Sequence, residues 1–442
     1  MHDTSMDDIT ILSSPLTLPC GLTLKNRLAK GAMTEGLADS DGSPNDGHVQ
    51  LYRTWAKGGC GLLITGNVMV DGTHLERPGN VILDGHQAED IRDRLAVWAA
   101  AGSENGCTIW MQLSHSGRQC QKKVNPQPKS ASDVQLGLPG GQFARPTPMT
   151  SAEIEALIAA FVRAATLAED TGFSGVQIHA AHGYLLSQFL SPNSNQRSDE
   201  WGGSLENRAR LLRLIVQQVK EACSDSFAVA VKLNSSDFQK GGFGAEDARQ
   251  VVRWLADDGV DLVEISGGTY EQPRMLELGG IEPVEEIKTR ASTREREAFF
   301  QAFAADIRDD CAVPLMVTGG FRTSHGMASA ITEDGVNLIG IGRPLCGAPD
   351  AVNDMLAGAA ELPRFERQLG KPDSFFGVNS PVMLIKAIAG FSVMAWYYAQ
   401  LVRLAAGKPV ALSLGTFKCF LSLQKSEAKW LKARRKSLQN LP

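Results

Sequence analysis

Three polar side chains follow a short apolar run near the middle of the chain. His179 and His182 lie three residues apart, and Tyr184 comes two residues later. The run that carries them, 175–181, is predicted to be a buried strand, and packing gives such a strand no reason to end in hydrogen-bonding side chains. Two imidazoles can hold one oxygen atom of a substrate while a nearby phenol delivers a proton. The triplet therefore indicates a site for acid–base chemistry.

The histidine pair has two other interpretations. A His-x-x-His pair can bind a metal ion, which normally needs one or two further ligands. The two side chains can also be ordinary core or surface histidines. The eight cysteines contain no CxxC motif, which argues against a zinc ribbon and a local iron–sulfur site. The residue types alone leave all three interpretations open.

Two later strands are predicted to be followed by glycine and arginine. Gly320 and Arg322 follow the run 314–319, and Gly342 and Arg343 close the next strand. Glycine lets backbone N–H groups approach phosphate oxygens, and arginine adds charge-assisted hydrogen bonds. Barrel turns need glycine for other reasons, but barrels commonly bind phosphate after strands seven and eight. The pattern therefore favours a phosphate site.

Elements that could position these groups recur along the chain. Eight short apolar runs alternate with segments of helical periodicity. The predicted strands are 27–33, 61–69, 108–114, 175–181, 228–234, 261–267, 314–319 and 338–342. The predicted helices are 47–58, 87–105, 151–171, 205–223, 245–258, 294–309, 323–334 and 350–358. Continuous apolar strands indicate a parallel sheet, and eight strand–helix pairs predict a (β/α)₈ TIM barrel. An open doubly wound sheet is the alternative.

Other segments do not fit the repeat. Residues 9–25 are predicted to form a β-hairpin that plugs the barrel bottom. Two long loops, 116–149 and 268–293, follow the third and sixth strands, at the end where barrel enzymes place their chemistry. We expect two domains, a barrel over 1–365 and a C-terminal helical extension over 366–442.

Composition excludes several classes of protein. The formal net charge of -5 gives no basic field for nucleic acid. The N-terminus has no targeting pattern, and the longest apolar stretch, 381–406, is interrupted by Lys386 and Arg403. We therefore expect a cytoplasmic protein without stable membrane insertion. The basic tail could lie on an anionic membrane, but packing on the barrel or on a second subunit is favoured.

The segment 191–208 makes the chemistry more specific. It reads SPNSNQRSDEWGGSLENR. Together with 175–187, it resembles the old yellow enzyme family of flavin-dependent ene-reductases. The resemblance covers roughly residues 10–360, and the spacing around the histidines is similar to that of the bacterial, thermophilic-like branch. The mixed charges of 191–208 favour a hydrogen-bonded structural lock rather than catalysis.

The resemblance implies an FMN-bound barrel that oxidises NADPH or NADH and reduces alkenes conjugated to a carbonyl or nitro group. His179 and His182 would bind the substrate oxygen, Tyr184 would protonate the α carbon, and no metal would be needed. Two other readings stay open. One is a related barrel acting on enoyl- or dienoyl-CoA thioesters, and the other is a flavin-binding module without turnover. The expected partner is a small-molecule enone or nitroalkene, and the chain could also form a homo-oligomer.

The resemblance also assigns cofactor-binding residues. Those implied at the flavin ring are Ala32, Met33, Thr34, Gly66, Gln112 and Lys232. Those implied at the phosphate or ribityl chain are Gly320, Arg322, Gly342 and Arg343. Three positions depart from the family pattern. The bacterial branch often has Cys in place of Thr34, the basic residue near flavin N1 is usually Arg rather than Lys232, and Gly36 stands where Tyr is frequent.

Overall fold

A computed structural model describes most of the chain. The described residues are 6–138, 141–267, 303–304, 306–307, 312–371 and 374–439. The predicted loop 268–293 and most of the predicted helix 294–309 lie outside them.

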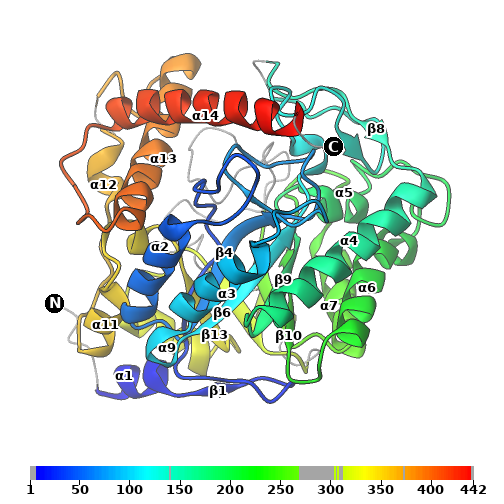
Figure 1. The fold of residues 1–442 in the computed structure, drawn as a ribbon. Helices are drawn as coiled ribbons and strands as arrows, with labels where there is room; N and C mark the ends of the chain where they lie inside the picture. The colour runs from blue at the N-terminus through cyan, green and yellow to red at the C-terminus, as the bar shows by residue number, and fades with distance from the viewer. Residues whose placement is uncertain are drawn as a thin grey trace.

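Eight parallel strands form a closed barrel (Figure 1). In chain order they are β3 (Leu28–Lys30), β4 (Leu62–Met69), β6 (Thr108–Ser114), β9 (Gly175–Ala180), β10 (Ala228–Asn234), β11 (Leu262–Ser266), β12 (Leu315–Thr318) and β13 (Leu338–Ile341). Each strand pairs with its successor, and β3 pairs with both β4 and β13, which closes the ring. The prediction of a TIM barrel rather than an open sheet is confirmed.

Helices cover the outside of the barrel. They include α2 (Asp46–Lys57), α3 (Ile91–Gly102), α4 (Ser151–Asp170), α5 (Leu185–Leu190), α6 (Leu205–Ala222), α7 (Ala245–Asp257), α9 (Ser324–Thr332), α10 (Pro344–Gly347) and α11 (Ala351–Leu356). Helix α4 begins as its sequence predicts. The Thr150 side chain accepts a hydrogen bond from the Glu153 N–H, and Glu153 accepts one from the Thr150 N–H. This capping box satisfies two backbone donors that the first turn leaves free.

The bottom of the barrel is filled by apolar side chains. The hairpin of β1 (Leu16–Thr17) and β2 (Thr23–Leu24) lies at that end, at the bottom of Figure 1. Its leucines, Leu16, Leu18 and Leu24, pack in one buried cluster with inward-facing barrel residues. The predicted plug is therefore present. Its predicted start was wrong, because Met6–Ser13 form helix α1 rather than hairpin.

Three helices follow the barrel: α12 (Glu366–Leu369), α13 (Met383–Ala405) and α14 (Thr416–Gln439). Trp396 and Leu401 of α13 are buried in the same core as Trp55 of α2. Helix α14, red in Figure 1, runs across the end of the barrel opposite the hairpin. Among the described residues, no helix is long and apolar enough to cross a membrane.

Candidate active site

The predicted triplet lies at the carboxyl end of β9. His179 belongs to the strand, His182 follows in the turn, and Tyr184 occupies the position just before α5. The ring centroid of His179 lies 5.0 Å from that of His182 and 4.8 Å from that of Tyr184. Both pairs are edge-on. The structure therefore brings the three predicted catalytic side chains together in one cluster.

A strained turn produces this cluster. His182 has a φ of 61° and Gly183 a φ of 76°, so two successive residues are left-handed. Such a backbone is unfavourable for a non-glycine residue and persists only when other contacts hold it. The His182 N–H donates to Asn234 Oδ1 at 3.1 Å, and its carbonyl accepts from Gln119 Nε2 at 3.1 Å. The reversal directs Tyr184 back toward His179.

Hydrogen bonds fix the tautomer of His179. Its Nδ1 accepts the Ala181 N–H at 3.2 Å, so the ring proton of the neutral form resides on Nε2. Burial, the neighbouring His182 and the Lys232 ammonium hold the pKa of His179 well below its usual value. His179 is therefore a neutral side chain with an N–H donor at Nε2.

His182 is neutral for the same reason. Burial and the Lys232 ammonium keep its pKa well below the usual value. Its Nε2 lies 2.7 Å from the Ser266 hydroxyl oxygen. Ser266 ends β11, so a second barrel strand orients the ring.

A chain of buried polar side chains runs across neighbouring barrel strands beside His179, which pairs with Lys232 in the register of β9 and β10. Gln112 Nε2 donates to Gln177 Oε1 at 2.6 Å, and Gln177 Nε2 donates to Glu264 Oε2 at 2.7 Å. Lys232 Nζ lies 2.7 Å from Glu264 Oε1, and their side chains are 2% and 0% exposed. The two predicted residues Gln112 and Lys232 thus belong to one layer. Gln177 and Glu264 were not predicted, although Glu264 is a carboxylate within an apolar strand, a signal of the kind that singled out Lys232.

The segment after β3 carries Ala32, Met33 and Thr34, which lie half-buried just beyond the strand. Gly66, which the family resemblance implies at the flavin ring, does not lie at the end of a strand. It lies inside β4, at an irregularity of the pairing between Ile64 and Asn67. A Cβ on Gly66 would lie 2.6 Å from the Met33 carbonyl oxygen, so glycine lets the two segments touch.

The predicted phosphate residues follow β12 and β13. Gly319 and Gly320 have φ values of 100° and 86°, and a Cβ added to Gly319 would meet nothing within 4 Å. A Cβ added at Gly342 would lie 3.7 Å from Met33 Sδ, so Gly342 lies beside the segment after β3.

The two predicted arginines face the C-terminal helices. Arg322 is buried, and its Nη2 lies 3.0 Å from Glu366 Oε1. Arg343, which precedes α10, lies near Glu366 and Tyr397 and favours the charged form of each, although burial raises the pKa of Tyr397 overall. Both arginines thus adjoin the C-terminal extension.

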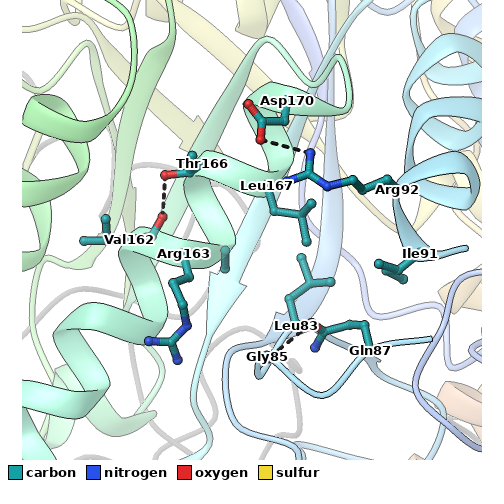
Figure 2. A pocket seen from close by; sticks show the side chains of 11 residues that line it. Leu83, Gly85, Gln87, Ile91, Arg92, Val162, Arg163, Thr166, Leu167 and Asp170 are labelled. Atoms are coloured by element: carbon teal, nitrogen blue, oxygen red, sulfur yellow. Dashed lines mark hydrogen bonds and ion pairs between the residues drawn. The ribbon is translucent and has the colours of Figure 1, made fainter. Parts of the chain in front are cut away.

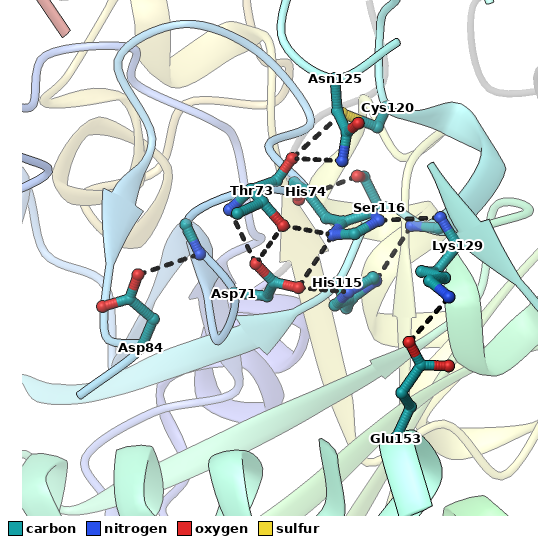
Figure 3. Close-up of polar contacts among 12 residues, drawn as sticks. Asp71, Thr73, His74, Asp84, His115, Ser116, Cys120, Asn125, Lys129 and Glu153 are labelled. Atoms are coloured by element: carbon teal, nitrogen blue, oxygen red, sulfur yellow. Dashed lines mark hydrogen bonds and ion pairs between the residues drawn. The ribbon is translucent and has the colours of Figure 1, made fainter. Parts of the chain in front are cut away.

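A second cluster of histidines lies between the loops after β4 and β6 (Figure 3). Asp71 Oδ2 accepts from His74 Nδ1 at 2.8 Å and from His115 Nε2 at 3.3 Å. The other ring nitrogens accept the backbone N–H of Lys129 and Gly117, respectively. These bonds place the proton of each neutral ring on the nitrogen that faces Asp71, and a metal ion would have to displace both protons. The cluster therefore holds two loops together, and it was not predicted from the sequence.

A hollow of ≈ 430 Å³ lies elsewhere, between α3 and α4 on the outer wall (Figure 2). Its lining includes an Arg92–Asp170 ion pair at 3.0 Å whose side chains are largely exposed. None of the predicted site residues lines it, so we assign it no role in the chemistry.

Buried polar atoms near the barrel mouth fit a polar planar ligand. Three of them have no hydrogen-bond partner among the described residues: Asn67 Oδ1, Ser114 Oγ and Thr318 Oγ1. They belong to β4, β6 and β12, at or near the carboxyl ends of these strands. Buried polar groups are rarely left unpaired, so such a group is expected to meet a ligand or water. Donors and acceptors around the mouth suit the ring edges of a flavin.

A closed parallel barrel with polar side chains at its carboxyl end is the architecture of barrel enzymes. The model of the NADH:flavin oxidoreductase / NADH oxidase family matches residues 12–360, and the chain belongs to this family. It is 38% identical over 360 residues to the NADH-dependent flavin oxidoreductase iliE of Hypocrea jecorina, covering 78% of this chain and 87% of that protein. It is 30% identical over 334 residues to an NADH oxidase of Thermoanaerobacter brockii, covering 74% of this chain and 48% of that one.

Solved structures share the fold. The old yellow enzyme homologue from Zymomonas mobilis superposes with a TM-score of 0.64 at 24% identity, over 80% of this chain and 94% of that one. A 2-naphthoyl-CoA reductase complex gives a TM-score of 0.72 at 20% identity, over 98% of this chain and 70% of that one. The predicted family is confirmed. The protein is an oxidoreductase enzyme of a family that uses a flavin and a nicotinamide nucleotide.

Proposed function

We propose that the protein is an FMN-dependent ene-reductase that uses NADPH or NADH to reduce an alkene conjugated to a carbonyl or nitro group. One observation carries the proposal. Two neutral imidazoles and one phenol meet within 5.0 Å at the carboxyl end of β9, beside a buried lysine layer. A flavin bound there would relay hydride from the nicotinamide to the β carbon of the alkene.

The histidines bind and polarise the substrate. His179 offers an N–H at Nε2, and the Ser266 contact holds the ring of His182. Hydrogen bonds to the carbonyl or nitro oxygen stabilise the negative charge that develops there. Because burial keeps both rings neutral, each acts as a hydrogen-bond donor and not as an acid.

Tyr184 supplies the proton. A phenol of pKa ~10 is a weak acid, but an enolate-like carbon is basic enough to accept its proton. Tyr184 is 5% exposed, which keeps bulk water from competing at the same position. The cofactor residues proposed for the flavin ring and phosphate are those implied by the family resemblance, with Gly66 at the pairing irregularity of β4.

Half-reaction kinetics test the assignment. Tyr184→Phe should slow reoxidation by an enone about 100-fold, the lower range for loss of a general acid, and should leave reduction by NAD(P)H within about twofold. Equal slowing of both half-reactions would remove Tyr184 from this role. The same assay with an enoyl-CoA thioester tests the alternative substrate class, and a wild-type protein that binds flavin but turns over neither substrate would favour a non-catalytic module.

The oxygen-binding role of the histidines needs a separate test. A phenol mimics an enolate oxygen, so His179→Ala should weaken phenol binding about tenfold by removing one buried donor. His86→Ala is a matched control, because His86 is exposed and lies outside the cluster. Unchanged phenol affinity in His179→Ala would argue against the proposed oxygen site.

A further inference from the structure

The buried acid Glu264 has no role in the proposed reaction, and yet it lies at the centre of the polar layer. It is 0% exposed. Its Oε2 accepts a hydrogen bond from Gln177, and its Oε1 forms an ion pair with Lys232. A buried carboxylate is costly unless it is paired, so the position must provide something that an apolar residue would not. Its contacts reach Lys232 directly and Gln112 through Gln177, and the family resemblance implies both residues at the flavin ring.

The first contact concerns charge. Lys232 Nζ lies 2.7 Å from Glu264 Oε1, at paired positions of the neighbouring strands β10 and β11. Reduction adds electrons to a flavin, so a nearby positive charge favours the reduced form and a nearby negative charge disfavours it. A lysine and a carboxylate in contact form a pair with a net charge near zero, so the pair has little electrostatic effect on a flavin beyond it. Glu264 therefore cancels most of the electrostatic effect of Lys232.

The second contact concerns direction. A carboxylate can only accept hydrogen bonds, so Gln177 must present its Nε2 to Glu264 Oε2. Its Oε1 then faces Gln112, which must in turn donate from Nε2. The charge of Glu264 thus fixes the orientation of two amides in sequence. Gln112 is left with its Oε1 and one N–H for other partners.

We infer that Glu264 is a positioning residue that lowers the reduction potential of the bound flavin by compensating Lys232 and orienting Gln112. The inference rests on the proposed function, because it requires a flavin beside Lys232. It explains why this strand carries an acid where packing alone would favour an apolar side chain. It also predicts that the reduced flavin is a stronger reductant than it would be beside Lys232 without Glu264.

The test is the midpoint potential of the flavin-loaded protein, measured against a reference dye. Glu264→Gln keeps the size of the side chain and removes its charge, so the potential should become more positive. A tenfold change in the preference for reduced over oxidised flavin corresponds to about 30 mV for a two-electron couple. Lys232→Met should shift the potential in the negative direction. The double variant should return close to wild type, because both charges are gone.

Asp261→Asn is the matched control. Asp261 is also a buried acid paired with a lysine, Lys220, at 3.1 Å, but it precedes β11 at the opposite end of the barrel. The flavin midpoint potential of Asp261→Asn should equal that of the wild type. An unchanged potential in Glu264→Gln would overturn the inference. If Glu264→Gln does not fold, the flavin potentials of Lys232→Met and of the double variant are compared instead. Equal potentials in these two variants would overturn the inference. A wild-type protein that takes up no flavin would overturn the proposed function as well.

Discussion

Arg77 Nη2 lies 3.0 Å from Glu427 Oε1, although 350 residues separate them along the chain. The Arg77 guanidinium also lies over the Tyr398 ring, 3.7 Å from its centroid. Glu427 belongs to α14 and Tyr398 to α13, whereas Arg77 follows β4 at the barrel mouth. A Cβ on Gly36 would approach Arg77 Cζ to 3.4 Å, so Arg77 lies between the extension and the segment that carries Thr34. Residues beyond the family match thus bind the loops around the site.

Helix α14 holds other mouth loops as well. Trp430 Nε1 donates to the Ala38 carbonyl at 2.8 Å, and Glu427 Oε2 lies 2.8 Å from Lys123 Nζ. These contacts reach the loops after β3 and β6. They favour packing on the barrel over attachment to a membrane, as the sequence predicted for the tail.

Loss of this docking should destabilise the protein. Glu427→Ala leaves the buried Arg77 with one partner fewer, which should cost about 2 kcal/mol of unfolding free energy. Lys429→Ala, two residues along the same helix and exposed, is the control and should change stability by less than about 0.5 kcal/mol. Urea denaturation of both variants measures the difference. Equal stabilities would show that the Arg77 contact contributes little.

Ser266 is expected to act through His182. Ser266→Ala removes the hydroxyl at 2.7 Å from His182 Nε2, so the ring loses the contact that orients it. Phenol affinity measured by calorimetry should fall about fivefold, in line with one hydrogen bond of about 1 kcal/mol. Ser235→Ala is the matched control, because its hydroxyl binds the Ser266 carbonyl and not the histidine. Similar losses in both variants would argue for a general packing effect.

Much of this architecture could be predicted from the sequence because it depends on local pattern. All eight strands were expected from continuous apolar runs, and the Thr150–Glu153 box from two residues at a fixed spacing. The His179, His182 and Tyr184 cluster was expected for the same reason. Glu264, Gln177 and Arg77 were not, because their partners come from distant strands and helices. The packing of the extension also depends on such long-range contacts.

The stability of the protein should fall as the pH is lowered from 7.5 to 5. Burial and the neighbouring His74 lower the pKa of His115 to about 4, so the folded state stays unprotonated in this range. The unfolded chain, with a histidine pKa of about 6.5, takes up the proton, which favours unfolding by about 2 kcal/mol at pH 5. His179 and His182 act in the same direction, since their pKa values are also lowered.

Urea denaturation at several pH values measures this dependence. His115→Asn should reduce the loss of stability between pH 7.5 and 5, whereas the exposed His86→Asn should leave it unchanged. An equal slope in the wild type and in His115→Asn would contradict a lowered pKa of His115.

The central claim is that a flavin at the barrel mouth passes electrons from a nicotinamide to an activated alkene. Its most direct test is the anaerobic absorption spectrum of the purified protein during sequential addition of NADPH or NADH and then of a simple enone. We predict a yellow flavin spectrum that bleaches with the nucleotide and returns with the enone. A colourless protein that takes up no FMN, or a bleached flavin that the enone does not reoxidise, would contradict the claim.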